Sequence, residues 1–428
     1  MLFNQTLTYI SLFSGAGVGC YGLLEEGFEC VATNEILEKR LNIQRINRKC
    51  KLDESYISGD IKKPETKEKI LKQIGFYSKK FGNDRVDLVV ATPPCQGMSV
   101  ANHKKKNDEI KRNSLVVESI DLIKQIKPRF FILENVPSFY KTGCIDKNDN
   151  LLEIGSMIEQ NLSGDYMLYD EIINFKNFGA NSSRTRTLVI GVCKEFKDFT
   201  SALEFFPDFK QEKTLKEVIG SLKPLAWGEY DSADFYHSFR TYPKHMQEWI
   251  KDLKEGQSAF ENVQDAISDL AYLCSNEGAF ESDYLNPIQS SYQALMRKNS
   301  PKLYNHQATN HSQAALEKLK LINKEQGKEC LPKNLHGKQQ FKSTWGCLNW
   351  NKISPTIDTR FDTPSNGTNS HPELHRSITP REAARIQSFS DDYIFYGNKT
   401  SVCKQIGNAV PPLLALALGK AILKSLRK

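Results

Sequence analysis

The chain has 428 residues and a formal net charge of +7, with 39% hydrophobic and 25% charged residues. This composition is that of an ordinary soluble globular protein, and the length predicts two domains. The sequence contains no run of 18 apolar residues and so predicts no membrane span. The first residues also lack a signal-peptide pattern. We therefore expect a cytoplasmic protein without a membrane partner. The ten cysteines include no C-x-x-C pair, which argues against a zinc site and a disulfide framework, and we expect no metal.

The first patterned segment is a strand followed by a glycine loop. Residues Thr8–Phe13 are mostly apolar, Ser14–Gly19 carry alternating glycines, and a helix is predicted from Cys20 onward. A strand, a glycine turn and a helix form the first unit of a doubly wound nucleotide-binding fold. The alternating glycines do not match the G-x-G-x-x-G phosphate fingerprint, so a tight turn without a ligand is an equally good interpretation.

Two further predicted strands end in an acidic residue. Glu29–Glu35 is the second strand and Tyr56–Ile61, with Asp60 near its end, is the third. An acid at the end of the second strand can accept hydrogen bonds from ribose hydroxyls, and one at the end of the third suits an exocyclic amine. Either acid could instead cap the helix that follows it. Taken together, the three strand ends favour a cofactor that contains adenosine.

The fourth predicted strand, Asp87–Ala91, ends abruptly at a proline pair followed by Cys95. Because prolines restrict the backbone, the cysteine is held at the mouth of the strand, where a thiol can meet a substrate. A free surface cysteine after a proline turn is the alternative. Residues 103–112 then carry five lysines and arginines, which form either a solvated face or a mobile loop that closes on phosphates.

The fifth predicted strand, Arg129–Pro137, carries Glu134 near its end. Carboxyl ends of parallel strands share one edge of a sheet, so Cys95 and Glu134 should face the same crevice. An acid near a thiol nucleophile is a candidate general acid. The last strand of this half carries Arg184 and Arg186, whose side chains point the same way because extended residues two apart share a face.

From about residue 195 to 375 the rhythm of strands and acids stops, which indicates a second domain inserted into the first. The tail returns to patterned sequence, with a helix predicted after a Thr379 cap and Pro380, and an apolar helix at the end of the chain. We expect a first domain at 1–194, a second domain at 195–395, and a segment at 396–428 that returns to the first domain.

In this order, the segments resemble the motifs of the cytosine-5 DNA methyltransferase family, in its bacterial restriction–modification form. The resemblance covers nearly the whole chain. It rests on six motifs: Phe13–Gly19, Pro93–Gln96, Glu134–Val136, Arg184–Arg186, Arg376–Phe389 and Gln405–Val410. One departure is that the family usually has Pro-Gln in the turn ahead of its Arg-x-Arg motif, where this chain has Asn181-Ser182.

The resemblance implies an α/β fold, with a Rossmann-like S-adenosylmethionine-dependent methyltransferase domain and an inserted target-recognition domain. It implies that the protein transfers a methyl group from S-adenosyl-L-methionine to carbon 5 of a flipped-out cytosine. The expected partner is a specific sequence in double-stranded DNA, and the expected intermediate is a covalent Cys95 adduct. A monomer, accompanied by a restriction endonuclease that acts on the same site, is the expected context.

The resemblance also assigns roles to individual residues. It implies a catalytic role for Cys95, Glu134, Arg184 and Arg186. It implies cofactor contacts by Phe13, Gly15, Gly17, Glu35, Asp60, Ile61, Pro93, Asn408, Ala409 and Val410. It implies substrate contacts by Pro94, Gln96, Ser99, Asn135 and Val136.

Three alternatives stay open at this point. A tRNA cytosine-5 methyltransferase would share the catalytic motifs, although the long inserted region favours a reader of DNA. A non-catalytic DNA-binding regulator would be expected to lack Cys95 or Glu134, and both are present. A nicotinamide-dependent dehydrogenase is disfavoured, because the G-x-G-x-x-G fingerprint is missing.

Overall fold

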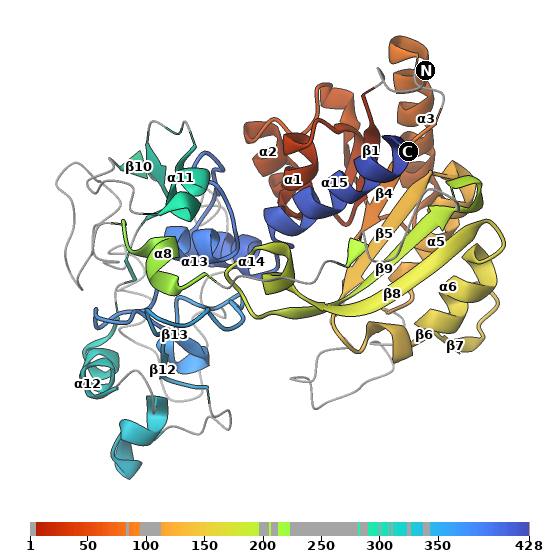
Figure 1. Ribbon diagram of the computed structural model, residues 1–428. Coiled ribbons are helices and arrows are strands. Elements are labelled where there is room, and N and C mark those ends of the chain that lie inside the picture. The colour runs from red at the N-terminus through yellow and green to blue at the C-terminus, as the bar shows by residue number, and fades with distance from the viewer. Residues whose placement is uncertain are drawn as a thin grey trace, which may run out of the picture. The chain divides into compact units, whose positions relative to one another are not determined.

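The structure is a computed structural model in which two compact units can be described (Figure 1). The first unit comprises Met1–Glu212 and Ala409–Lys428, and the second comprises Lys213–Asn408. The target-recognition role of the second unit stays a prediction. The structure describes residues 6–82, 85–94, 113–196, 205–206, 213–222, 281–282, 290–298, 300, 302–306, 308–309, 311–322, 327–336 and 343–427.

The described part of the first unit is built on a seven-stranded sheet with the order β3-β2-β1-β4-β5-β9-β8. Strands β1 to β5 are parallel, whereas β9 runs antiparallel to both of its neighbours. The strands are β1 (Thr8–Leu12), β2 (Glu29–Glu35), β3 (Tyr56–Ser58), β4 (Leu88–Ala91), β5 (Phe130–Asn135), β8 (Tyr166–Asn174) and β9 (Thr185–Cys193). The predicted α/β fold is confirmed. Strand order reverses between β1 and β4, and ligands of such folds bind outside the carboxyl ends of the strands at this point.

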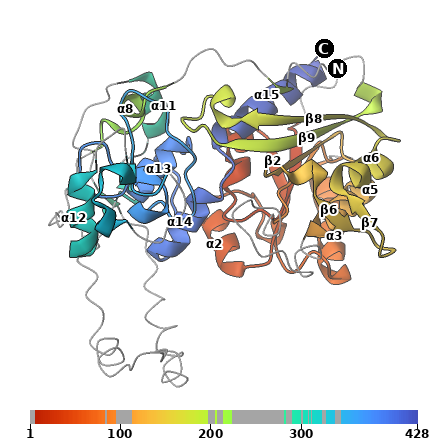
Figure 2. The ribbon, with the colours of Figure 1, turned by 90° about the horizontal axis from the view of Figure 1, so that it is seen from below.

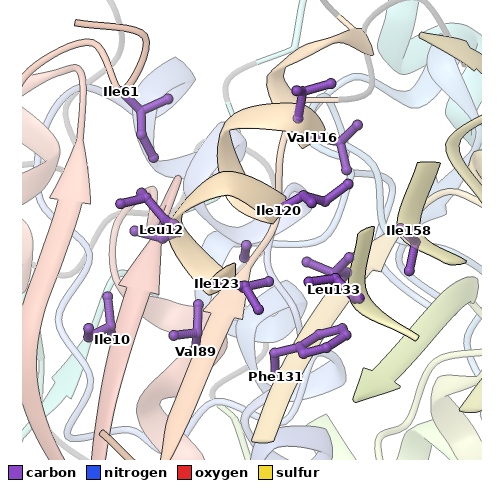
Figure 3. Packing of buried hydrophobic residues seen from close by; sticks show 14 of the residues in the cluster. Ile10, Leu12, Ile61, Val89, Val116, Ile120, Ile123, Phe131, Leu133 and Ile158 are labelled. Atoms are coloured by element: carbon purple, nitrogen blue, oxygen red, sulfur yellow. The ribbon is translucent and has the colours of Figure 1, made fainter. Parts of the chain in front are cut away.

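Both faces of the sheet are covered because successive strand residues point to opposite sides. On one face, Leu12, Val89 and Phe131 are fully buried against α5 (Figure 3). On the other face, Tyr9, Leu88 and their neighbours pack against α1 and α15. Figure 2 shows α15 and α5 on opposite sides of β8 and β9. The helices of this unit are α1 (Tyr21–Glu25), α2 (Glu38–Ile46), α3 (Pro64–Phe81), α5 (Leu115–Ile126), α6 (Ile154–Leu162) and α15 (Pro412–Arg427), and a hairpin is formed by β6 (Gly143–Ile145) and β7 (Leu151–Glu153).

The final helix α15 belongs to the first unit because it packs directly on α1. A Cβ atom placed on Gly22 of α1 would lie 2.0 Å from the carbonyl oxygen of Pro412, so the two backbones meet only because this residue is glycine. The stretch Lys399–Leu426 is long and apolar enough to cross a membrane by length and composition, and its most apolar window of 18 residues has a mean hydropathy of 1.6. However, 61% of that window is buried, and a buried core helix of a folded domain passes the same test.

The second unit is centred on α13, whose side chains form buried ion pairs. Glu382 accepts two hydrogen bonds from Arg376 at 2.8 Å, and Asp391 accepts two from Arg385 at 2.6 and 3.0 Å. The predicted Thr379 cap is confirmed, since Thr379 and Glu382 form a reciprocal capping box. Leaving one of these buried charges unpaired would cost roughly 3–5 kcal/mol, so the pairs fix the position of α13 within this unit.

The remaining elements of the second unit are short. The apolar helix predicted at the end of the chain is divided between α14 and α15. The elements are α8 (Leu215–Ile219), β10 (Glu281–Ser282), α11 (Ser291–Arg297), β11 (Leu303–Tyr304), α12 (Gln313–Leu321), β12 (Gly346–Cys347), β13 (Thr368–Ser370), α13 (Pro380–Ile386) and α14 (Lys399–Gly407).

Candidate active site

The glycine loop after β1 has a left-handed backbone. The φ angles are 53° at Phe13, 55° at Gly15 and 87° at Gly17, a region that residues with a Cβ atom rarely adopt. A Cβ on Gly17 would lie 2.6 Å from Cγ of Gln44, whereas a Cβ on Gly15 would meet nothing within 4 Å among the described residues. The space beside Gly15 is therefore open to a ligand, while Gly17 is needed for packing below the loop.

Gln44 of α2 holds this loop from beneath. Its Nε2 donates to the carbonyl oxygen of Gly15 at 2.7 Å and to Oγ of Ser14 at 2.8 Å, and its Oε1 accepts from Thr33 at 2.8 Å. Gln44 is fully buried, so these hydrogen bonds replace those it would make to water. Sequence reasoning missed Gln44, because one polar residue on an ordinary helix carries no signal of a contact across 29 residues.

The two acids at the ends of β2 and β3 have different surroundings. The buried carboxylate of Glu35 accepts from the backbone N–H of Gly15 at 2.9 Å and of Leu37 at 3.2 Å, and also from Arg40. Asp60 is partly exposed and accepts from the N–H of Lys62 in a local turn. Each carboxylate oxygen can accept a further hydrogen bond, so these contacts leave room for a ligand hydroxyl or amine. Ile61, beside Asp60, is buried.

The residues that precede the predicted nucleophile are held from two sides. The hydroxyl of Thr92 donates to the carbonyl oxygen of Phe13 at 3.2 Å, and Nδ2 of Asn135 donates to the carbonyl oxygen of Pro93 at 2.9 Å. Pro93 is buried and Pro94 is exposed. The glycine loop, the proline pair and the end of β5 are thus brought together at one edge of the sheet.

Several predicted site residues lie outside the described residues. These are Cys95, Gln96 and Ser99, together with the basic segment 103–112. Their roles stay predictions that rest on the sequence and on the position of the proline pair.

Glu134 lies at the same edge, beside an arginine. Its Oε1 is 3.2 Å from Nε of Arg186. Burial raises the pKa of the Glu134 carboxyl above its usual value, and the positive charges of Arg186 and Arg184 oppose this shift only in part. Arg184 is also buried, with its guanidinium 5.9 Å from the centre of the Phe175 ring. Because β9 is antiparallel to β5, its first residues lie beside the last residues of β5, which brings both arginines to Glu134.

The remaining predicted contacts are distributed over both units. Asn135 is 3% exposed, and its Oδ1 accepts from the backbone N–H of Val136 at 2.9 Å. Val410 lies against the glycine loop, since a Cβ on Gly19 would be 3.1 Å from its Cβ. Ala409, beside Val410, is buried in the first unit, and Asn408 is an exposed residue at the end of α14 in the second.

The comparison that decides the family is a match over almost the whole chain. The model of the C-5 cytosine-specific DNA methylases matches residues 7–424. The chain belongs to this family. This methylase is therefore an enzyme that transfers a methyl group to carbon 5 of cytosine in DNA, and the tRNA methyltransferase, regulator and dehydrogenase alternatives are not favoured.

Individual relatives agree with this assignment. The methylase is 29% identical over 357 residues to the Type II methyltransferase M.DdeI of Desulfomicrobium norvegicum, covering 79% of this chain and 72% of that protein. It is 25% identical over 425 residues to the Type II methyltransferase M1.HphI of Haemophilus parahaemolyticus, covering 99% and 88%. A crystal structure described as a DNA modification methyltransferase encoded within an E. coli prophage has the same fold, with a TM-score of 0.66, 22% identity, and coverage of 99% and 100%.

Proposed function

We propose that this methylase uses S-adenosyl-L-methionine as methyl donor and modifies a flipped-out cytosine within one duplex sequence of a restriction–modification system. The observation that carries the proposal is the arrangement at one edge of the sheet, where the buried Glu134 lies 3.2 Å from Arg186 and the next residue, Asn135, is hydrogen-bonded to the proline pair that ends β4. The Type II methyltransferases among the relatives support the restriction–modification context. In that context we expect a cytoplasmic monomer with an endonuclease acting on the same site.

The proposed cofactor cradle is formed by the ends of β1, β2 and β3. The open space at Gly15 would accept the cofactor close to the backbone, Glu35 would accept from the ribose hydroxyls, and Asp60 from the adenine amine. When bound, S-adenosyl-L-methionine supplies an electrophilic methyl group. The further proposed contacts are Phe13, Gly17, Ile61, Pro93, Asn408, Ala409 and Val410.

The proposed chemistry divides one difficult step into easier ones. The Cys95 thiolate adds to carbon 6 of the cytosine while Glu134 donates its proton to ring nitrogen 3, and carbon 5 becomes a nucleophile that takes the methyl group. A base then removes the proton from carbon 5 and the thiolate leaves, while ring nitrogen 3 returns its proton to Glu134. Arg186, held beside Glu134, would support the base oxygen, and Arg184 adds a second positive charge. Pro94, Gln96, Ser99, Asn135 and Val136 are the proposed substrate contacts.

Bisulfite sequencing of DNA from a host that expresses the protein tests this function. We expect cytosines within one short sequence to be protected, and no such sequence in a host with an empty vector. Transfer to purified tRNA, compared with duplex DNA in the same assay, distinguishes the RNA-modifying alternative. A folded protein that protects no DNA sequence but methylates tRNA would contradict the proposal.

The Glu35→Ala variant tests the cofactor site. It should weaken S-adenosylmethionine binding by about 1–3 kcal/mol, because it removes a buried acceptor and leaves the N–H of Gly15 unpaired. The measurement is a cofactor titration on the folded variant. Glu38→Ala is the matched control, since Glu38 lies nearby on α2 with its side chain 53% exposed and pairs with Arg45. If both variants bound S-adenosylmethionine equally well, Glu35 would not contact the cofactor, and the alternative that it caps the following helix would be favoured.

A further inference from the structure

Two side-chain hydrogen bonds join the three strand ends that form the candidate site. Thr92 donates to the Phe13 carbonyl, and Asn135 donates to the carbonyl of Pro93, the next residue along. The first bond links β4 to the glycine loop, and the second links β4 to the strand that carries Glu134. Two consecutive residues therefore connect both halves of the site.

The bond from Thr92 meets a strained position. Phe13 has a φ angle of 53° although it is not glycine, a strained conformation that persists only where its surroundings impose it. The carbonyl that accepts from Thr92 belongs to this residue. The N–H of the next residue, Ser14, donates to the carbonyl of Asn34 in β2 at 3.0 Å. Thr92 thus contributes to holding the entry to the glycine loop in its left-handed form.

The hydrogen bond from Asn135 is made by a side chain that is buried and fixed by its partners. Asn135 is 3% exposed, and its amide uses its nitrogen on Pro93 and its oxygen on the N–H of Val136. The carbonyl of Pro93 is therefore fixed relative to the end of β5, one residue beyond Glu134. Both polar atoms of the amide are engaged by backbone, so the side chain has a positioning role in addition to the substrate contact proposed for this residue.

We propose that Thr92 and Asn135 are positioning residues that brace the proline pair between the glycine loop and Glu134. The proposal rests on the proposed function, in which the residue after Pro94 is the nucleophile. The two ends of the brace should act on different steps. Thr92 should act mainly on cofactor binding, through the loop, whereas Asn135 should act mainly on the reaction with cytosine, through the placement of the proline pair beside Glu134.

The variants Thr92→Val and Asn135→Leu test the brace, since each removes the donor and nearly keeps the volume. Thr92→Val should raise the Kd for S-adenosylmethionine about three- to tenfold, the worth of one hydrogen bond. Asn135→Leu should leave that Kd within about twofold and slow covalent trapping on DNA with 5-fluorocytosine at the methylated site about tenfold or more. Thr92→Ser retains the hydroxyl and should restore the cofactor affinity. Asn135→Ala is the second variant if Asn135→Leu does not fold.

Thr187→Val is the matched control, because the buried Thr187 pairs with Asn135 across β5 and β9 but donates to Pro137. It should change neither the cofactor affinity nor the trapping rate. If Thr92→Val and Asn135→Leu lowered the Tm but left affinity and trapping rate unchanged, the brace would be only structural and the proposal would be wrong. If the wild type gave no trapped complex, the nucleophile assignment would fail, while an unchanged Kd in Thr92→Val would independently overturn the brace.

Discussion

A denaturation-stable complex should form when the wild-type methylase meets DNA with 5-fluorocytosine at its target site in the presence of S-adenosylmethionine. Fluorine replaces the hydrogen that must leave carbon 5 as a proton, so the final elimination cannot occur and the enzyme stays attached through Cys95. Cys95→Ser should give no complex and lose more than about 1000-fold in activity, because an alcohol is far less ionised than a thiol at neutral pH. A denaturing gel with labelled DNA measures the complex.

Cys193→Ser is the control for this experiment. Cys193 ends β9, at the edge of the sheet opposite to Glu134, and lies 3.4 Å from a guanidinium nitrogen of Arg85. This variant should be trapped like the wild type. A wild type that methylates a site but forms no complex on it, or a Cys95→Ser variant with full activity, would show that the nucleophile assignment is wrong.

Glu134→Gln should slow methyl transfer about 10²- to 10⁴-fold, the usual contribution of a positioned acid. Glutamine can donate a hydrogen bond to ring nitrogen 3 but cannot release a proton to it. Since burial raises the pKa of Glu134, its active protonated form persists to a higher pH than for an exposed glutamate. Because the Cys95 thiolate is gained as pH rises, the quantity to measure is the ratio of the wild-type to the Glu134→Gln single-turnover rate, which should fall as pH rises through this pKa.

The same pKa offers a second measurement. Arg186 lowers the pKa of Glu134 through its positive charge. In the Arg186→Ala background, measured against the Arg186→Ala/Glu134→Gln double variant, the fall in this ratio should therefore move to higher pH, in addition to any loss of rate. Glu171→Gln is the control for Glu134→Gln, because it also removes one negative charge. Glu171 is exposed on β8, the strand next to β9. Wild-type rates in Glu134→Gln, or a profile that Arg186→Ala shifts to lower pH, would contradict the acid role.

The parallel strands were predictable because their ends are marked in the sequence. The run before Phe13 stops at glycines, and the run before Cys95 stops at two prolines, so β1 and β4 have nearly the expected bounds. The acids Glu35 and Glu134 follow from the same logic, since each comes at the end of an apolar run. These signals are local, and a single sequence contains them in full.

The contacts between distant segments were not predictable. The apolar sequence of β9 does not indicate whether this strand is parallel or antiparallel to β5. The antiparallel direction is what brings Arg186 to Glu134. Likewise, Thr92 and Gln44 are ordinary polar residues whose partners, the Phe13 and Gly15 carbonyls, are defined only once the sheet has formed. Chain reversal and long-range hydrogen bonds depend on tertiary packing, which one sequence does not display.

The docking of α15 on α1 at Gly22 has a consequence for biosynthesis. The apolar face of the first unit that contains Leu23 is completed by Leu418 and Ile422, which come after the second unit in the chain and are therefore synthesised after it. Domains usually fold as they emerge from the ribosome, but this one must wait while the whole of the second unit is made. Until α15 is synthesised, the nascent chain exposes this apolar face to chaperones and proteases.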